Sequence, residues 1–318
     1  MRSSSSSPAD RIVWFPRIAL LTALLTLGLI VFGAVVRVTD SGLGCGNQWP
    51  LCHGSIIPPL DNITAWIEWL HRLFAVLIGL FGIGTLVLAI RAYRTRNRAV
   101  LTATITAAIL FAIQSGLGAI VVVLDLPPTF VTLHLGTAML LFAALLLAGV
   151  LSVYKPESHY QPDQVTTLIY ITAALSLVII LTGALVRGSG STLACTDWPL
   201  CNGQIIPTDQ GRSALIHMFH RASVLGLGVA LILVVWQAFR HRQSPRLQWL
   251  SAVALICYLA QAGVGALFVL SAAAPIWGAA HVGMAAATWG LLVVMSIMEW
   301  RNTRQPQEIE SMKAAWQH

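Results

Sequence analysis

The chain has 318 residues, of which 57% are hydrophobic and 10% are charged, and its formal net charge is +7. This composition is far more apolar than that of a soluble globular domain, so it excludes soluble proteins and indicates a chain embedded in the lipid bilayer. The positive charge does not indicate a nucleic acid partner, because the basic residues lie in short tails and loops and form no single exposed face.

Eight apolar stretches are long enough to cross about 30 Å of hydrocarbon as helices. In chain order they cover residues 18–36, 66–90, 99–124, 130–153, 165–186, 215–239, 247–270 and 276–298. The first stretch lacks a small-residue cleavage site, so we expect it to stay as a helix rather than to be removed as a signal peptide. The predicted fold class is therefore an all-α integral membrane protein with eight transmembrane helices.

The basic residues predict the orientation of these helices. Fourteen of the nineteen Lys and Arg residues share one side if the helices alternate: Arg2, Arg11 and Arg17, those at 91–98, Lys155, those at 240–246, and those of the C-terminal tail. The positive-inside rule places this side in the cytoplasm. We therefore expect a multi-pass protein with both termini in the cytoplasm and with the segments 37–65 and 187–214 outside.

The sequence contains an internal repeat. The segment at 33–58, GAVVRVTDSGLGCGNQWPLCHGSIIP, returns at 183–207 as GALVRGSGSTLACTDWPLCNGQIIP. Three shorter motifs recur at nearly the same distance along the chain: EWLHR at 68–72 with HMFHR at 217–221, QSGLGA at 114–119 with QAGVGA at 261–266, and HLG at 134–136 with HVG at 281–283. Each copy holds an even number of helices, so the copies should share one direction and be related by a pseudo-two-fold axis along the membrane normal.

The repeat also predicts the domain limits. We expect an N-terminal four-helix bundle at 1–153, a cytoplasmic linker at 154–164, a C-terminal four-helix bundle at 165–300 and a cytoplasmic tail at 301–318. The linker, YKPESHYQPDQ, is the polar segment between the two copies.

Four histidines match between the copies, namely His71 and His134 in the first and His220 and His281 in the second. Each lies near the outer end of its predicted span. Ionisable groups inside a membrane usually face the bundle interior, and two imidazoles from facing helices can supply both axial ligands of a haem iron. The pattern predicts one haem per bundle, with hydrogen-bonded core histidines or the gating groups of a transporter as alternatives. Zinc fits less well, because no third nitrogen or sulfur ligand recurs in both copies.

Four arginines lie near the same outer ends. Arg72 and Arg221 directly follow two of the histidines, whereas Arg37 and Arg187 close the first and fifth spans. Guanidinium groups there are candidate partners for haem propionates. The alternative is snorkelling to the membrane surface, which accounts for Arg37 and Arg187 equally well. The deeper positions of Arg72 and Arg221 favour propionate binding.

The copies differ at one informative position, where Glu68 in the first corresponds to His217 in the second. Glu68 precedes His71 by one helical turn on the same face, about 4.5 Å along the axis. A carboxylate there suits proton transfer during oxygen chemistry or stabilisation of positive charge on an oxidised substrate. The alternative is an interfacial acid that is merely paired with Arg72.

Four of the five cysteines form two close pairs, Cys45 with Cys52 and Cys195 with Cys201, in the predicted outer segments. Because the outside is oxidising, two short-loop disulfides are expected. A redox-active pair in the first segment is the alternative. Cys257, inside the span 247–270, is expected to be a small buried apolar residue.

Together these motifs resemble those of the haem A synthase family: outer segments with WPLC, E-x-x-H-R at 68–72, the matching H-R at 220–221, and the histidines at 134 and 281. The resemblance covers about residues 15–300. It implies an oxidoreductase that oxidises the C8 methyl group of haem O to a formyl group, by successive hydroxylations and loss of water, giving haem A for terminal oxidases.

The resemblance also implies roles for individual residues. Glu68 would be catalytic, His71 and His134 would bind the iron of the substrate haem O, and His220 and His281 would bind that of a haem b cofactor. The repeat and the Arg that follows favour His220 over its neighbour His217 as the ligand. Molecular oxygen or water and an electron donor are implied as co-reactants.

The family members with cysteines in both outer segments are of the Gram-positive type, which implies a bacterial cell membrane. Haem O synthase is a candidate partner, and a homo-oligomer is a further candidate. The residues alone indicate a double haem-binding bundle with one specialised half. They leave open a dihaem b-type electron-transfer cytochrome and a haem transporter or chaperone. Glu68 opposite His217 favours an enzyme, because an electron conduit gains little from making one half different.

Overall fold

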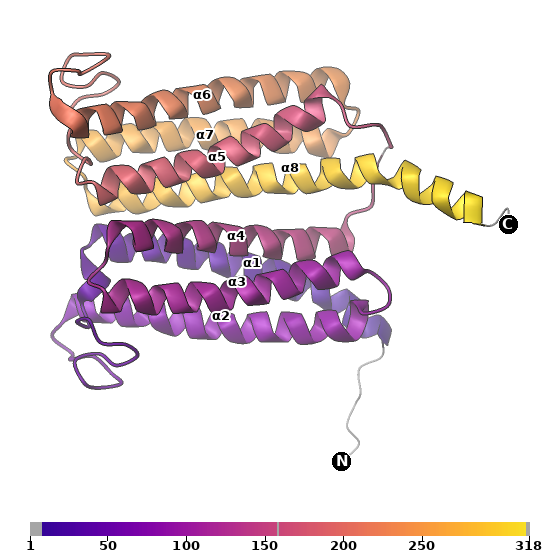
Figure 1. The fold of residues 1–318 in the computed structure, drawn as a ribbon, viewed down its shortest axis with the longest axis horizontal. Helices are drawn as coiled ribbons and strands as arrows, with labels where there is room; N and C mark the ends of the chain where they lie inside the picture. The colour runs from indigo at the N-terminus through magenta and orange to yellow at the C-terminus, as the bar shows by residue number, and fades with distance from the viewer. Residues whose placement is uncertain (1–7, 158, 316–318) are drawn as a thin grey trace.

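The computed structural model describes residues 8–157 and 159–315, and these form eight long helices joined by loops (Figure 1). The helices are α1 (Pro8–Val38), α2 (Ile63–Tyr93), α3 (Arg98–Val123), α4 (Pro128–Val153), α5 (Gln164–Gly188), α6 (Gly211–His241), α7 (Pro245–Leu270) and α8 (Pro275–Ala315), with a short 3₁₀ turn, η1 (Ser41–Leu43), after α1. All eight long helices contain a stretch that is long and apolar enough to cross a membrane. The predicted all-α membrane fold with eight spanning helices is confirmed.

The helix ends follow from local sequence. Four helices begin after a residue whose side chain accepts a hydrogen bond from a main-chain N–H three residues on, and these caps are Asn62, Asn97, Asp163 and Ser244. Such caps satisfy donors that the first helical turn leaves unpaired. Four of the described helices, α1, α4, α7 and α8, begin with Pro, which is tolerated at the first helical position.

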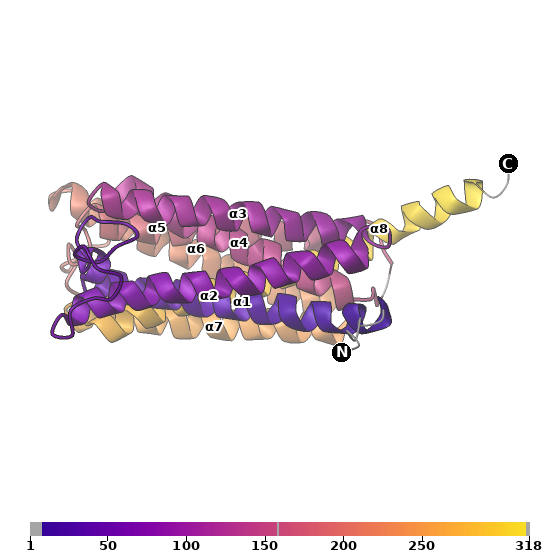
Figure 2. The same cartoon turned by 90° about the horizontal axis from the view of Figure 1, so that it is seen from below.

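The last helix is longer than its predicted span. α8 continues to Ala315, so most of the predicted tail at 301–318 is a helical extension that projects beyond the bundle (Figure 2). Apart from Pro306, this segment is rich in strong helix formers such as Arg, Gln, Glu, Met and Ala. Arg2 of the predicted N-terminal tail and residues 316–318 lie outside the described residues.

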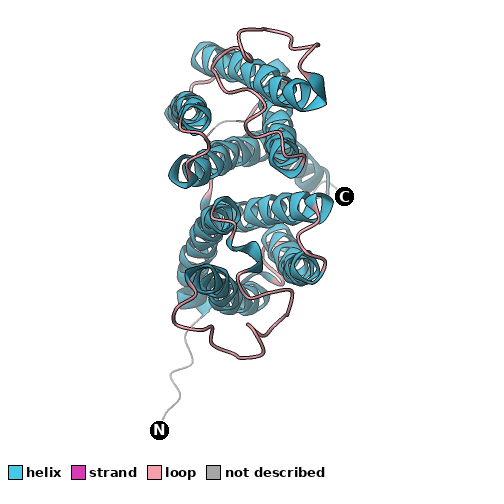
Figure 3. Cartoon of the chain, turned by 90° about the vertical axis from the view of Figure 1, so that its left-hand side faces the viewer, coloured by secondary structure: helices cyan, strands magenta, loops and turns pink. Residues whose placement is uncertain are grey.

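The helices form two groups of four that lie side by side, α1–α4 and α5–α8 (Figures 1 and 3). Within the first group α1 contacts α2 and α4, and α3 contacts α2 and α4; α5–α8 repeat this pattern. The two groups meet through α1, α4, α5 and α8. Helices α2 and α4 are therefore diagonal partners across the interior of the first group, as α6 and α8 are in the second.

All the helices run between two ends of the molecule. We call the end that carries segments 39–62 and 189–210 the loop end, and the end that carries the connection 154–163 the linker end; they lie at the left and right of Figure 1. Because α2, α4, α6 and α8 all begin at the loop end, the four matched histidines lie in the loop-end half of the bundle.

A buried ionic cluster fastens the linker end of the second group. Arg242 at the end of α6 donates hydrogen bonds to Asp163, at 2.7 and 2.8 Å, and to Glu299 of α8, at 2.9 and 3.1 Å. The fully buried Glu299 also accepts hydrogen bonds from Tyr160, at 2.5 Å, and from Thr166, at 2.7 Å. Because its carboxylate has several donors and a cation, Glu299 is tolerated inside the bundle.

This cluster is not copied in the first group. Tyr93 and Ser152 occupy the positions that match Arg242 and Glu299 in the repeat. Arg242, one of the cations that predict the cytoplasmic side, is thus mostly a buried structural residue.

Replacing Arg242 with Met should lower the free energy of unfolding by about 3–5 kcal/mol, because Glu299 would remain buried without its cation. Arg246→Met is the matched control: the Arg246 side chain is 68% exposed and its guanidinium pairs with Glu157 at 3.0 Å, so the loss of this ion pair should cost only about 0–1 kcal/mol. Thermal unfolding of the purified full chain in detergent measures both. Equal midpoints for the two variants would contradict a stabilising role for the cluster.

The same cluster predicts a dependence on pH. Hydrogen bonds from Arg242 are the main reason that the pKa of Asp163 lies below its ordinary value. A lowered carboxyl pKa adds stability above the ordinary pKa, and that contribution disappears as the pH falls through the lowered value. The midpoint of the wild-type protein should therefore fall on acidification more steeply than that of Asp163→Asn.

Candidate functional site

The four matched histidines lie in two pairs, each on diagonal helices. His71 of α2 and His134 of α4 face the interior of the first group, and His220 of α6 and His281 of α8 that of the second. Within each pair the imidazoles are near enough for their charges to interact. The structure therefore brings together the two matched histidines of each copy of the repeat. No group of three or more His, Cys, Asp or Glu side chains suited to a metal ion occurs in the described part of the chain.

Each of these imidazoles is backed by a glycine on a neighbouring helix. A Cβ atom placed on the glycine would lie 2.8 to 3.2 Å from the Cε1 atom of the histidine, in the pairs Gly33–His71, Gly118–His134, Gly183–His220 and Gly265–His281. Any larger residue would have to displace the ring or the helix. The motifs QSGLGA and QAGVGA, which contain Gly118 and Gly265, are of the kind that allows close helix packing or flat access for a ring, and the structure shows such close packing at all four glycines, which match in the repeat.

In the second group, both imidazoles are held through Nδ1. The Nδ1 atom of His220 lies 2.8 Å from the Thr182 hydroxyl, and that of His281 lies 3.2 Å from the carbonyl oxygen of Gln261. Both Nε2 atoms are thereby left for a metal, an arrangement typical of metal-binding histidines, which use their other nitrogen to fix the ring. These residues fit the two axial ligands of a haem iron.

The first pair is held less firmly. Nε2 of His134 lies 3.1 Å from the side-chain amide nitrogen of Gln114. The buried Nδ1 atoms of His71 and His134 have no hydrogen-bond partner among the described residues. The rings of this pair therefore have one hydrogen bond among the described residues, whereas those of the second pair have two.

Glu68 is buried at the loop end of the first group, with 3% of its side chain exposed. Its carboxylate accepts a hydrogen bond from the main-chain N–H of Cys45 at 2.9 Å and forms an ion pair with Arg72. The pairing with Arg72 that the sequence offers as an alternative is therefore present, but Glu68 also anchors the loop above the histidines. His217 lies at the matching position and is likewise buried.

Two arginines fasten the loops over the histidine pairs. Arg72 donates hydrogen bonds to the carbonyl oxygens of Gln48 and Leu51, at 3.2 to 3.3 Å, and Arg221 donates to those of Pro199 and Leu200. The sequence does not predict these contacts. The buried Nη2 atom of Arg221 has no partner within the described residues, so it keeps a donor for an anionic group such as a propionate.

The other two arginines meet where the groups join. Arg187 of the second group donates hydrogen bonds to the Asp40 carboxylate, at 2.9 Å, and to the carbonyl oxygen of Arg37, at 3.3 Å, both in the first group. An arginine that merely extended to the membrane surface would not make these hydrogen bonds to the other group. The buried Nε atoms of Arg37 and Arg187 lack a partner in the part of the chain that the structure describes. Each arginine thus keeps one buried donor that the described residues do not use.

The predicted disulfides are present. Cys45 is bonded to Cys52 and Cys195 to Cys201, and all four residues are buried at the base of their loops. Cys257 differs from its prediction, since it is only half-buried on α7.

Peptide mapping of protein purified without reductant should find both disulfides intact, because each pair is buried and within bonding distance. The free thiol of Cys257 serves as an internal control and should be alkylated after denaturation. Recovery of all five cysteines as alkylated thiols would contradict the assignment.

Comparison with known proteins identifies the family. Residues 16–293 match the model of the family described as cytochrome oxidase assembly protein, COX15-CtaA. The chain belongs to this family.

Several curated relatives in the comparison carry the name "Heme A synthase". The protein of Symbiobacterium thermophilum is 34% identical over 285 residues, which cover 85% of this chain and 90% of the relative. That of Geobacillus thermodenitrificans is 33% identical over 305 residues, covering 92% and 93%, and that of Alkalihalophilus pseudofirmus is 32% identical over 263 residues, covering 80% and 87%. The similarity therefore extends over both four-helix groups.

Proposed function

We propose that this chain is a haem A synthase, an oxidoreductase that converts the C8 methyl group of haem O to a formyl group. The family match and the names of the relatives support this function over an electron-transfer cytochrome or a haem transporter. The observation that carries the proposal is the difference between the two histidine sites, since a buried carboxylate, Glu68, is present at the first and replaced by His217 at the second.

In this proposal the first group binds the substrate haem O. His71 and His134, on the diagonal helices α2 and α4, would bind its iron, and each ring is backed by a glycine of a neighbouring helix. Arg72 and the loop that it holds close the site from the loop end and restrict the entry of water. Donors of the arginines at this end neutralise the propionates.

The second group would hold haem b through His220 and His281. Haem b, when bound, accepts and donates single electrons. Thr182 and the carbonyl of Gln261 orient the two ligands, and the ionic cluster around Arg242 keeps α6 and α8 in place. The pseudo-two-fold axis predicted from the repeat would relate this site to the first.

Glu68 is the proposed catalytic residue. Its carboxylate lies one turn from His71 and faces the closed loop, where it can take up a proton or stabilise positive charge as the methyl group is oxidised. Arg72 and the N–H of Cys45 hold the carboxylate in one orientation. Molecular oxygen or water and an electron donor complete the reaction.

The chain is a multi-pass membrane protein, and its relatives are bacterial. We propose that the loop end faces outward and that both termini lie in the cytoplasm, as the basic residues indicate. We also propose haem O synthase as a partner that delivers the substrate. A homo-oligomer would bury part of the apolar surface of the helices.

Replacing Glu68 with Ala should lower haem A formation by about 10²–10⁴-fold, the usual contribution of a general acid or base, while the haem content of the protein is kept. The variant should accumulate haem O or a hydroxylated intermediate. Glu157→Gln, at the linker end, is the control and should behave as wild type. Haem extraction and chromatography from cells that also make haem O measures the products. Wild-type amounts of haem A from Glu68→Ala would reduce Glu68 to a structural partner of Arg72.

Replacing His220 or His281 with Ala should remove the b-type absorbance of the purified protein, because each would supply an axial ligand. His71→Ala should retain this absorbance but hold haem O weakly. His217→Ala is the matched control, because it removes a neighbouring imidazole on the same helix. Loss of haem b from His217→Ala but not from His220→Ala would reverse the ligand assignment.

A further inference from the structure

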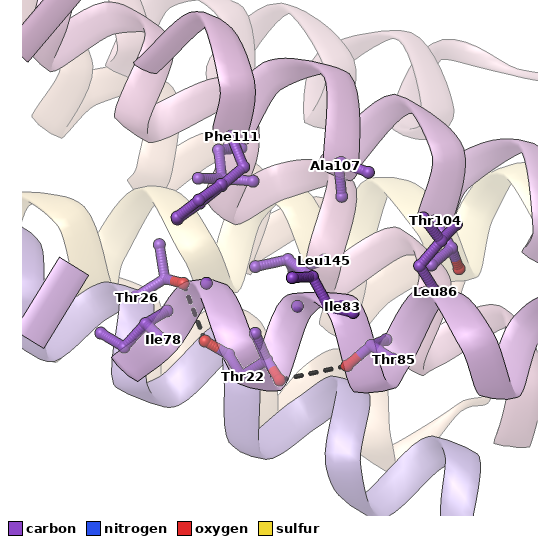
Figure 4. A pocket seen from close by; sticks show the side chains of 14 residues that line it. Thr22, Thr26, Ile78, Ile83, Thr85, Leu86, Thr104, Ala107, Phe111 and Leu145 are labelled. Carbon is purple, nitrogen blue, oxygen red and sulfur yellow. Dashed lines mark hydrogen bonds between the residues drawn. The ribbon is translucent and has the colours of Figure 1, made fainter. Parts of the chain in front are cut away.

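The first group contains a cavity of about 90 Å³ that is partly open to the surface, on the linker-end side of the histidine pair (Figure 4). It lies between α1, α2, α3 and α4. Its lining includes Ile78, Gly82, Ala108, Phe111 and Leu145. The proposed reaction centre between His71 and His134 does not include any of these residues.

The cavity is apolar although four threonines line it. The hydroxyls of Thr22, Thr26, Thr85 and Thr104 donate to main-chain carbonyl oxygens four residues earlier, at 2.7 to 2.8 Å. Figure 4 also shows the contact of 3.3 Å between the hydroxyls of Thr22 and Thr85. With their donors used in this way, the threonines offer no free donor to the cavity. A cavity of this kind favours hydrocarbon over water.

Two small residues create the cavity, and the second group has large residues in their place. In the repeat, Gly82 corresponds to Leu231 and Ala108 to Leu255. Leu231 is fully buried in the core of the second group together with Tyr258, and Leu255 packs against this core. The space that is filled with leucine in the second group is therefore open in the first.

The position of the cavity suits a long substituent on a porphyrin. Gly82 follows His71 by eleven residues, which corresponds to about 16 Å along α2. Haem O differs from protohaem in carrying a long prenyl chain where protohaem has a vinyl group. With the propionates held at the loop end, a chain on the other side of the porphyrin extends toward the linker end and reaches this depth.

We propose that the cavity binds the end of the prenyl chain of haem O and that Gly82 and Ala108 make the first group selective for haem O over protohaem. This inference rests on the proposed function. The volume is smaller than that of cavities of about 150 Å³ that take up a benzene ring, so it suits one isoprenoid unit rather than the whole chain. The leucines of the second group close the equivalent space, as expected for a site whose haem has no prenyl chain.

The test places leucines in the first group at the two positions where the second group has them. Gly82→Leu and Ala108→Leu fill the cavity, and Gly84→Leu is the matched control. Gly84 also corresponds to a leucine, Leu233, which is exposed on the outer face of α6, and Gly84 does not line the cavity. A Cβ atom at Gly82 or at Gly84 meets no atom within 4 Å, so a side chain can begin at either position without displacing a neighbour.

Purified full-length protein that retains its haem b is titrated with haem O and, separately, with protohaem, and binding is followed by absorbance. Gly82→Leu and Ala108→Leu should weaken haem O binding by at least about tenfold and leave protohaem binding unchanged. Only haem O carries the prenyl chain that the filled cavity could no longer bind. Gly84→Leu should match the wild type for both haems. Unchanged haem O affinity in the filled variants, or equal weakening for both haems, would overturn the proposal.

Two further measurements distinguish the prenyl pocket from a lipid site and from the proposed enzyme activity. If an acyl chain of a membrane lipid occupies the cavity instead, Gly82→Leu will lose a co-purifying lipid without losing haem O affinity, and the proposal is overturned. Haem A formation is measured in the same strains. If the wild type and Gly84→Leu bind haem O selectively but form no haem A, the proposed function is contradicted. The proposal that the cavity binds the prenyl chain would still stand.

Discussion

The approach of two imidazoles across the diagonal of a four-helix bundle is the constraint on which this structure depends. Each ring needs a neighbouring helix without a side chain at the point of contact, and a glycine meets that need at all four histidines. The neighbouring helices of each bundle stay in contact around these rings. The loops, the arginines and the disulfides lie at the end of the bundle nearest to these glycines and histidines.

The two groups use this frame differently. In the second, the imidazoles are oriented by Thr182 and Gln261, and leucines fill the interior below them. In the first, two ring nitrogens are unpaired within the described residues, a carboxylate lies one turn away, and a cavity remains. The two histidine sites therefore differ in the hydrogen bonds to their rings, in charge and in packing, a difference that the proposed resident cofactor and substrate would require.

Much of the fold could be predicted, because hydropathy gives the eight spans and the repeat gives the pairing of the histidines and cysteines. The sequence could not show which side of a helix faces inward. Gly82 and Gly84 both correspond to leucines in the repeat. The packing of the helices shows that, of these two glycines, Gly82 lines the cavity and Gly84 does not. The role of Arg242 was equally hidden, because its partners Asp163 and Glu299 are distant in sequence and a loop cation ordinarily stays in water.

The contact between Arg187 and Asp40 bears on how the duplicated chain arose. An ancestor with one copy could have formed this bond in both directions within a symmetric dimer. The present chain can form it only once, because Gly190 stands where Asp40 would be repeated. The two halves therefore meet through a contact that runs in one direction only, which makes the interface between the repeats unsymmetrical.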